Sequence, residues 1–214
     1  MDLRYPRLMC LTSDDCSISH SEQVKELINS GADFIQLRTK ELQGEELFQE
    51  VRLANDYAVK NNALLVVNDY VDVVQSTGAG GVHLGFNDSS IEYATDTLGD
   101  RTIIGSTVHN ISEAKIVKDK GLSSYVGLGP YRATTTKPDL EFTLSESEIY
   151  EIIEILSPMP IYLIGGIGLR DCGLVSKFNI SGLAVCSNLS STSSYGCYVS
   201  NFQKEIYKQE FVHS

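Results

Sequence analysis

The stretch Leu64-Leu65-Val66-Val67-Asn68-Asp69 is an unbroken apolar run that ends in two polar residues. A second run of this kind, Ile161-Tyr162-Leu163-Ile164, is followed by a pair of glycines. Strands that are apolar at consecutive positions are covered on both faces, which is typical of parallel sheets flanked by helices. The two runs therefore predict a parallel sheet that is buried under helices.

Outward from these runs, strand-like and helix-like segments alternate along the chain. We expect strands at Leu8–Ser13, Phe34–Arg38, Ala63–Asn68, Gly81–Leu84, Thr102–Ser106, Ser124–Gly127, Pro160–Ile164 and Gly182–Cys186. We expect helices at Ser21–Ser30, Glu45–Asn61, Val71–Thr77, Ile91–Leu98, Ile111–Lys120, Ser145–Leu156, Arg170–Lys177 and Tyr195–Gln209. Ser21, followed by the acidic Glu22, is expected to open the first helix.

Eight such units in 214 residues average about 27 residues each, near the lower limit for a (β/α)8 barrel. The expected fold is therefore an α/β TIM barrel that forms a single domain over residues 1–214. A doubly wound open sheet with fewer strands is the alternative.

The charge of the chain limits the classes of partner. With 17 Lys and Arg against 28 Asp and Glu, the net charge is −11, which disfavours nucleic acid and anionic membrane surfaces as partners. The longest apolar runs are far shorter than the roughly 18 residues of a membrane span, and residues 1–6 do not resemble a signal peptide. We expect a cytoplasmic protein that acts on small molecules, and the sequence leaves a homo-oligomer open.

The five cysteines are an odd number without zinc-ligand spacing, so neither disulfides nor structural zinc are expected.

Polar residues and glycines follow the expected strands, where parallel barrels build their active sites. They are Gln36, Arg38 and Lys40, then Asn68 and Asp69, Asp88, Thr107 and His109, Gly129-Pro130, Thr134-Thr135-Thr136-Lys137, Gly165-Gly166-Ile167-Gly168, and Cys186-Ser187-Asn188. The glycines suit a phosphate, and the threonines with Lys137 suit a second anionic group. Two carboxylates from neighbouring strands suit Mg²⁺ bound together with a substrate phosphate. The pattern predicts two anionic substrates and a divalent metal.

Each of these residues also has a structural interpretation. Taken alone, a residue such as Arg38 or Lys40 is more often a solvated surface cation than a ligand group. Asp69 and Asp88 are equally compatible with caps of the helices that follow them. His83 is expected to be a packed strand histidine rather than a catalytic one.

Several motifs, in order along the chain, resemble the thiamine-phosphate synthase (thiamine-phosphate pyrophosphorylase) family. They are Ile35-Gln36-Leu37-Arg38-Thr39-Lys40, Val67-Asn68-Asp69, Gly81-Val82-His83-Leu84-Gly85-Phe86-Asn87-Asp88, Ile104-Gly105-Ser106-Thr107-Val108-His109, Tyr125-Val126-Gly127-Leu128-Gly129-Pro130, Thr134-Thr135-Thr136-Lys137, Ile164-Gly165-Gly166-Ile167 and Val185-Cys186-Ser187. Each motif alone is weak, but the series is specific.

The resemblance implies a barrel that joins hydroxymethylpyrimidine diphosphate to hydroxyethylthiazole phosphate with Mg²⁺, giving thiamine monophosphate and pyrophosphate. It implies that Arg38 and Lys137 are catalytic and that Asp69 and Asp88 bind the metal. It further implies substrate contacts by Gln36, Arg38, Lys40, Asn68, Thr107, Thr134, Thr136, Lys137, Gly166, Cys186 and Ser187.

The chain departs from the usual family pattern at a few positions. Thr107 replaces a serine, Phe86 a glutamine, Cys186 a small aliphatic residue, and Arg132-Ala133 an aromatic residue followed by proline. The role of Arg132 stays open at this point. A thiazole tautomerase of the same fold and a non-catalytic sensor of thiamine precursors are the alternative functions, and the threonine and lysine cluster favours the synthase over the tautomerase.

Overall fold

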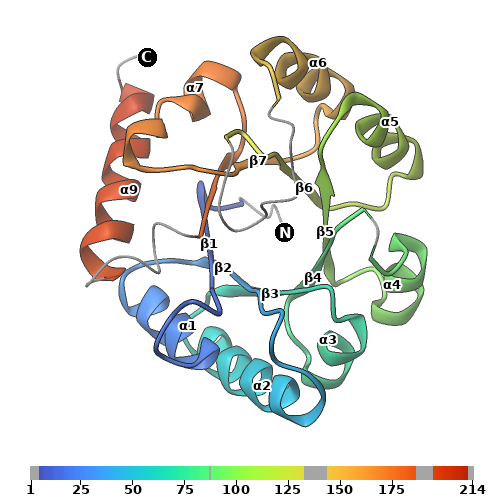
Figure 1. Ribbon diagram of the computed structural model, residues 1–214, viewed down its shortest axis with the longest axis vertical. Helices are drawn as coiled ribbons and strands as arrows, with labels where there is room; N and C mark the ends of the chain where they lie inside the picture. Colours follow the sequence, from blue (N-terminus) through green and yellow to red (C-terminus); the bar gives the residue numbers. More distant parts are fainter. Residues whose placement is uncertain (1–4, 87, 133–143, 187–194, 212–214) are drawn as a thin grey trace.

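The computed structural model describes residues 5–86, 88–132, 144–186 and 195–211. Eight parallel strands form a closed barrel in the order of the sequence, and β1 pairs with both β2 and β8 (Figure 1). The strands are β1 (Leu8–Leu11), β2 (Phe34–Leu37), β3 (Leu64–Asn68), β4 (Gly81–Leu84), β5 (Ile103–Val108), β6 (Tyr125–Leu128), β7 (Ile161–Ile164) and β8 (Gly182–Val185). The predicted TIM barrel is confirmed, and the open-sheet alternative is wrong because the closing pair is present.

Helices surround the barrel, and in Figure 1 α9 lies between α7 and α1. The helices are α1 (His20–Asn29), α2 (Gly44–Lys60), α3 (Val71–Thr77), α4 (Ile91–Leu98), α5 (Ile111–Lys120), α6 (Glu146–Leu156), α7 (Leu174–Phe178) and α9 (Tyr195–Phe211), with a short 3₁₀ turn, η1 (Leu169–Asp171), before α7.

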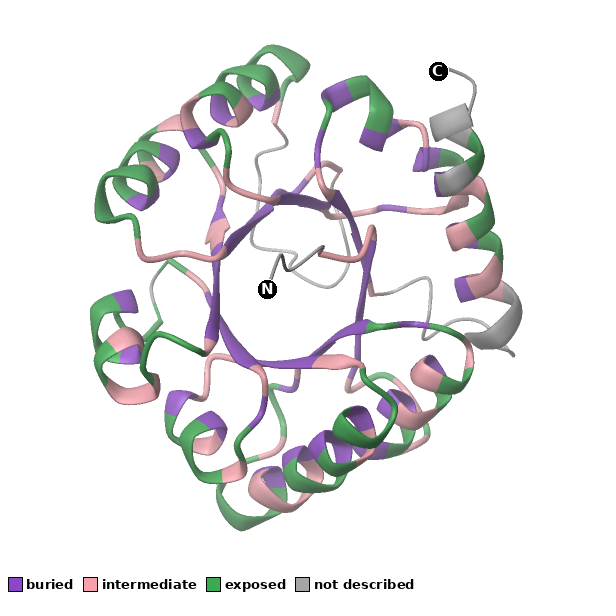
Figure 2. Cartoon of the chain, turned by 180° about the vertical axis from the view of Figure 1, so that it is seen from behind, coloured by how far each residue is buried: buried purple, intermediate pink, exposed green. Residues whose placement is uncertain are grey.

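Alternate residues of each strand face two different cores. Residues such as Val67 and Leu163 pack outward against the helices, whereas Val66 and Tyr162 pack inside the barrel. The strands are accordingly buried on both faces, while the helices are buried only on the side toward the strands (Figure 2). The continuous apolar runs of the sequence therefore reflect two cores, one on each side of the sheet.

Aromatic rings fill the barrel interior at the amino ends of the strands. Phe34 packs edge-on against Tyr125 and Tyr162, with ring centroids 5.5 and 5.4 Å apart, and Tyr5 lies 6.3 Å from Phe34. The Tyr162 hydroxyl donates to the Pro6 carbonyl at 2.5 Å. These rings occupy one end of the barrel, so an internal space can form only toward the carboxyl ends.

Two details of the expected helices are corrected. Helix α1 begins at His20 instead of Ser21, because Ser19 is the N-cap and forms a capping box with Glu22. The helix expected at Arg170–Lys177 is divided into η1 and α7, since Cys172 and Gly173 separate the two.

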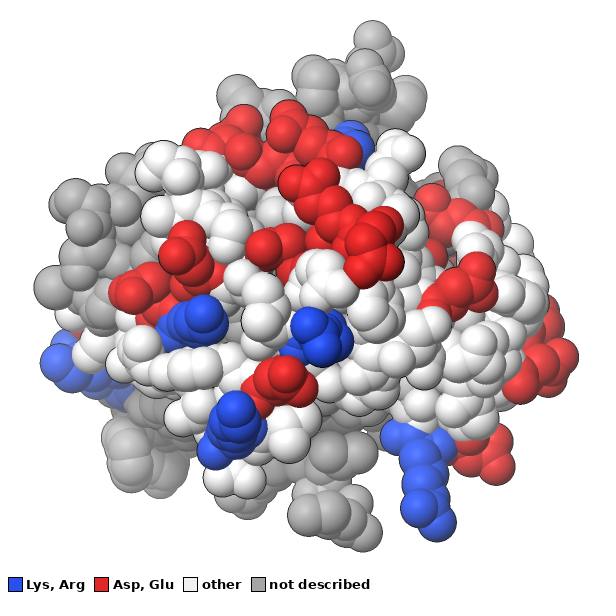
Figure 3. All heavy atoms as spheres, turned by 90° about the horizontal axis from the view of Figure 1, so that it is seen from below, with Lys and Arg blue, Asp and Glu red and all other residues white. Residues whose placement is uncertain are grey.

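The face drawn in Figure 3 carries more Asp and Glu than Lys and Arg side chains, in keeping with the negative charge of the chain. Among the described residues, no helix combines the length and the apolar character needed to cross a bilayer.

Candidate active site

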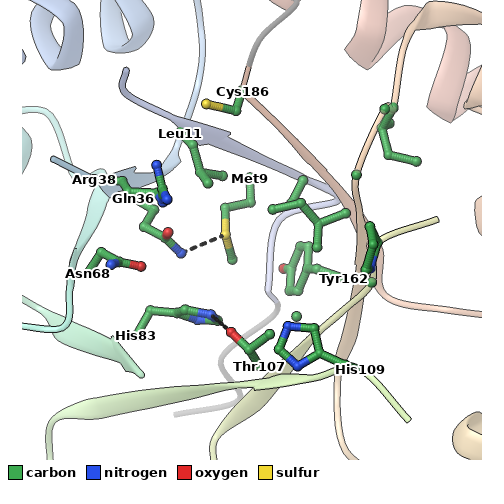
Figure 4. A pocket seen from close by; sticks show the side chains of 18 residues that line it. Met9, Leu11, Gln36, Arg38, Asn68, His83, Thr107, His109, Tyr162 and Cys186 are labelled. Atoms are coloured by element: carbon green, nitrogen blue, oxygen red, sulfur yellow. Dashed lines mark hydrogen bonds between the residues drawn. The ribbon is translucent and has the colours of Figure 1, made fainter. Parts of the chain in front are cut away.

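A cavity opens at the carboxyl ends of the strands and encloses about 910 Å³, including the solvent at its mouth. Figure 4 shows that its labelled lining side chains come from strands around the barrel. Of the residues expected at the site, six line this cavity: Gln36, Arg38, Asn68, Thr107, Gly166 and Cys186. Sequence spacing alone therefore located much of the cavity wall.

Strand β2 supplies the amide and the cation of the cavity wall. Gln36 is buried, and its Nε2 lies 3.7 Å from the Met9 sulfur. Arg38 follows β2 at a position where its backbone N–H donates to Thr12 Oγ1 at 2.9 Å. In the part of the chain that the structure describes, the Arg38 guanidinium forms no salt bridge. Its charge is thus available to an anion in the cavity.

Lys40, two residues beyond Arg38, is held through its backbone. Its N–H donates to Asp14 Oδ2 at 2.9 Å, and Asp14 Oδ1 accepts from Thr39 Oγ1 and lies 3.0 Å from His20 Nε2. Burial opposes ionisation of Asp14, but the hydrogen bonds from Thr39 and Lys40 hold the pKa of this carboxyl below its usual value. The loop after β1 therefore fixes the loop after β2 that carries both cations.

His83, expected to be a packed strand histidine, is buried on β4 and also lines the cavity, a place that the sequence interpretation did not give it. Its Nδ1 and Nε2 lie 2.9 Å from Tyr125 Oη and Thr107 Oγ1 respectively. Burial raises the pKa of Tyr125, so that its phenol stays protonated at neutral pH. With Nδ1 as the acceptor from this phenol and Nε2–H as the donor to Thr107, His83 would orient the Thr107 hydroxyl. The available signal was strand alternation, which places His83 on the inward face of β4 together with Gly81.

His109 also lines the cavity, just after β5. Its Nδ1 lies 3.0 Å from Glu113 Oε2, and its backbone N–H donates to the same oxygen at 2.7 Å. Glu113 lies in the first turn of α5, where a carboxylate is favourable. This pairing fixes the imidazole ring at the wall of the cavity.

The turn after β7 and Cys186 after β8 form another part of the cavity wall. Gly165 and Gly166 have φ angles of +103° and +62°, a region that glycine enters without steric cost. Burial raises the pKa of the Cys186 thiol to about 11, although the Arg38 cation opposes this shift. The thiol is therefore protonated at neutral pH, and it donates to the Thr12 carbonyl at 3.7 Å.

The remaining expected residues do not line this cavity or cannot be placed. Lys40, Asp69 and Asp88 are described but lie outside its lining, and Asp88 instead lines a second recess beside α4 and α5. The expected contacts at Thr134, Thr136, Lys137 and Ser187 lie outside the described residues.

Neither of the two carboxylates expected to bind metal is at the N-cap of the helix that follows it. Tyr70 is the N-cap of α3, and Ser90 caps α4. The Asp69 N–H donates to the His83 carbonyl at 2.9 Å, and Asp88 Oδ2 accepts from the Gly85 N–H at 2.7 Å, so both residues are anchored at the end of β4. The described residues contain no group of three or more His, Cys, Asp or Glu that could hold a metal unaided. Two carboxylates suit Mg²⁺ only when a substrate and water supply further oxygens.

Comparison with known proteins gives a consistent result. Residues 8–189 match the family model described as thiamine monophosphate synthase. The chain is similar to thiamine-phosphate synthases of Dictyoglomus thermophilum, at 32% identity over 86% of this chain and 83% of the relative, and of Flavobacterium johnsoniae, at 28% over 97% and 100%. It is also similar to a solved structure of thiamine phosphate pyrophosphorylase from Pyrococcus furiosus, with a TM-score of 0.84 at 27% identity, covering 95% of this chain and 96% of that one.

Proposed function

The chain belongs to the thiamine monophosphate synthase family, and we propose that the cavity at the carboxyl ends of its strands is where its substrates react. It is a thiamine-phosphate synthase, a transferase that joins hydroxymethylpyrimidine diphosphate to hydroxyethylthiazole phosphate and releases pyrophosphate. The observation that supports this location is the convergence of Gln36, Arg38, Asn68, Thr107 and Gly166, from the ends of four strands, on one cavity.

The reaction exchanges one bond for another. The bond between the pyrimidine methylene carbon and the diphosphate oxygen breaks, and its electron pair leaves with pyrophosphate. The lone pair of the thiazole nitrogen forms the new carbon–nitrogen bond. Because no proton is transferred in this exchange, the site needs charge stabilisation and positioning rather than a nucleophile or a general base.

The residues of the chain divide these tasks. Arg38, and Lys137 beyond the described residues, stabilise the charge that develops on the leaving pyrophosphate. Gln36 and Asn68 supply amide groups that can pair with the aminopyrimidine, and Thr107 supplies a hydroxyl. In the same proposal Lys40 binds the diphosphate, and Thr134 and Thr136 contact the thiazole substrate. The phosphate of that substrate is bound by Gly166, Cys186 and Ser187.

Mg²⁺ is the proposed cofactor, and Asp69 and Asp88 are the residues that would hold it. Their oxygen atoms are the ligand type that Mg²⁺ prefers. Within the described residues no larger group of possible ligands is present, which fits a metal that arrives with its diphosphate. When bound, the ion neutralises negative charge on the departing pyrophosphate.

Purified protein incubated with both substrates and Mg²⁺ should form thiamine monophosphate, and a chelator should abolish this product. We expect Asp69→Asn to raise the Mg²⁺ concentration for half-maximal rate by at least about tenfold, because one oxygen ligand is lost. The measurement is product fluorescence after oxidation, over a Mg²⁺ titration.

Arg52→Gln is the matched control, because Arg52 is an exposed cation on α2 whose side chain contacts Gln49. It should leave the Mg²⁺ dependence unchanged. Full activity in the presence of chelator would refute the metal assignment, and an unchanged Mg²⁺ requirement in Asp69→Asn would remove Asp69 from it.

A further inference from the structure

Arg132, one of the positions at which the chain departs from the family pattern, forms an ion pair across the loops. Its Nη1 and Nη2 donate to Asp171 Oδ2 and Oδ1 at 2.8 and 2.7 Å, a two-pronged contact with a carboxylate that is only 4% exposed. The guanidinium carbon lies 4.6 Å from the centre of the Tyr131 ring. The charge of Arg132 is therefore compensated within the protein, unlike that of Arg38.

The same arginine and its neighbour contact three successive carbonyl groups of the glycine turn. The Tyr131 N–H donates to the Ile164 carbonyl at 2.8 Å, and the Arg132 N–H to that of Gly165 at 3.1 Å. Arg132 Nη1 then donates to the Gly166 carbonyl at 3.0 Å. All three carbonyls are thus directed toward the segment that follows β6.

Because each trans peptide unit is planar, the direction of its carbonyl fixes the direction of its N–H. Within one peptide unit the C=O and the N–H point to opposite sides, so the N–H groups of Gly166 and Ile167 point away from Arg132. Gly165, Gly166 and Ile167 line the cavity. Successive backbone N–H groups in a turn with left-handed residues form a concave site for anions.

Asp171 holds a further part of the turn. Its Oδ2 also accepts from the Gly168 N–H at 2.8 Å, so one carboxylate joins the arginine to the start of η1. The turn is packed closely on the preceding loop, since a Cβ on Gly165 would lie 2.8 Å from Pro130 Cα. The arginine and the turn are thus joined by hydrogen bonds and by close packing.

We propose that Arg132 and Asp171 are positioning residues for the phosphate of the thiazole substrate: the pair holds the carbonyls of Gly165 and Gly166 away from the cavity, so that the amides of this turn face the phosphate. The cation itself is not a phosphate ligand. This inference rests on the proposed function, because it assigns the thiazole phosphate to this turn.

The test measures KM separately for each substrate. Arg132→Lys keeps the charge but loses the two-pronged contact, and Asp171→Asn keeps the size but weakens it. Each should raise KM for the thiazole phosphate about tenfold and leave KM for the diphosphate within about twofold. Arg170→Gln, an exposed cation next to Asp171, is the matched control and should change neither value.

Asp171→Asn separates positioning from direct binding. If Arg132 were itself a phosphate ligand, releasing it from Asp171 would leave KM for the thiazole phosphate unchanged or lower it, and this outcome would overturn the proposal. An equal rise of both KM values together with a lower melting temperature would also overturn it, because the pair would then be merely structural.

A binding measurement is independent of turnover. Inorganic phosphate titrated into ¹⁵N-labelled wild-type protein should shift the amide resonances of Gly166 and Ile167, and Arg132→Lys should weaken this response about tenfold. Equal responses in the two proteins would refute the positioning role. Failure of the wild-type protein to form thiamine monophosphate would instead refute the proposed function, whatever the phosphate response.

Discussion

Gly105 shows how a single residue makes room for the network under the cavity. A Cβ at this position would overlap the Tyr125 ring and would lie 2.6 Å from His83 Nδ1. Because Gly105 has no side chain, His83 Nδ1 and Tyr125 Oη can lie 2.9 Å apart inside the barrel.

We expect Gly105→Ala to lower the free energy of unfolding by about 1–3 kcal/mol, because the Tyr125 ring is packed against Phe34 and Tyr162 and cannot retreat from the added methyl group. Urea denaturation monitored by circular dichroism measures the change. Gly127→Ala is the control on the neighbouring strand, where the added Cβ would lie 3.2 Å from His83 Cε1, and it should cost less. Equal stability of Gly105→Ala and wild type would show that the aromatic layer is easily displaced.

Asp171 should also make stability depend on acid. Burial opposes its ionisation, yet the hydrogen bonds from Arg132 and Gly168 hold the pKa of this carboxyl below its usual value. A lowered pKa in the folded state stabilises the fold above the unfolded pKa of about 3.9, and this contribution is lost as the pH falls through the folded pKa.

The difference in unfolding free energy between wild type and Asp171→Asn should therefore be largest near neutral pH and shrink as the pH falls below about 4. Denaturation at a series of pH values measures it. The exposed Asp119, changed to Asn, serves as the control and should show little difference at any pH. A difference that stays constant down to pH 2 would contradict the ionic origin of the contact.

At the scale of elements, the loop after β1 supports the loop that delivers the cations. Asp14 accepts from the Thr39 hydroxyl and the Lys40 N–H, and Thr39 Oγ1 in turn accepts from the N–H groups of Glu41 and Leu42. Beyond the contact of Arg38 with Thr12, the Asp14 carboxylate thus ties the start of the segment leading to α2 to the loop after β1.

Asp14→Ala should therefore release this segment, and trypsin should cleave after Arg38 and Lys40 faster than in the wild type, because a protease needs a locally opened chain. Limited proteolysis followed by mass spectrometry identifies the cut sites. Asp15→Ala removes the adjacent, exposed carboxylate and should leave the cleavage rate unchanged. Equal rates in all three proteins would show that the loop is held by other contacts.

For the whole molecule, local patterns predicted what depends on neighbours in the sequence. The expected ranges of α3, α4 and α5 agree with the structure, and all eight strands are present, because apolar periodicity and turn residues are local properties. The wall of the cavity followed from strand ends, which parallel topology brings to one rim.

Contacts between distant residues could not be predicted in this way. Arg132 and Asp171 are 39 positions apart, and His83 and Tyr125 are 42 apart, so no local pattern relates them. The helix expected at Arg170–Lys177 is interrupted at Cys172 and Gly173. This interruption depends on how the preceding loop holds Asp171. Such features depend on strand pairing: the pairing of β6 with β7 brings the loops after them together, and β5 joins β4 to β6.

The aromatic layer has a consequence for the order of events. Tyr5, Phe34, Tyr125 and Tyr162 fill the amino-terminal end of the barrel, so the cavity opens only toward the carboxyl ends in the described part of the chain. Both reactants of the proposed reaction would then share one mouth. The one bound nearer the rings would be enclosed until the other leaves, so depth in the barrel, rather than affinity alone, would set the sequence of arrival and departure.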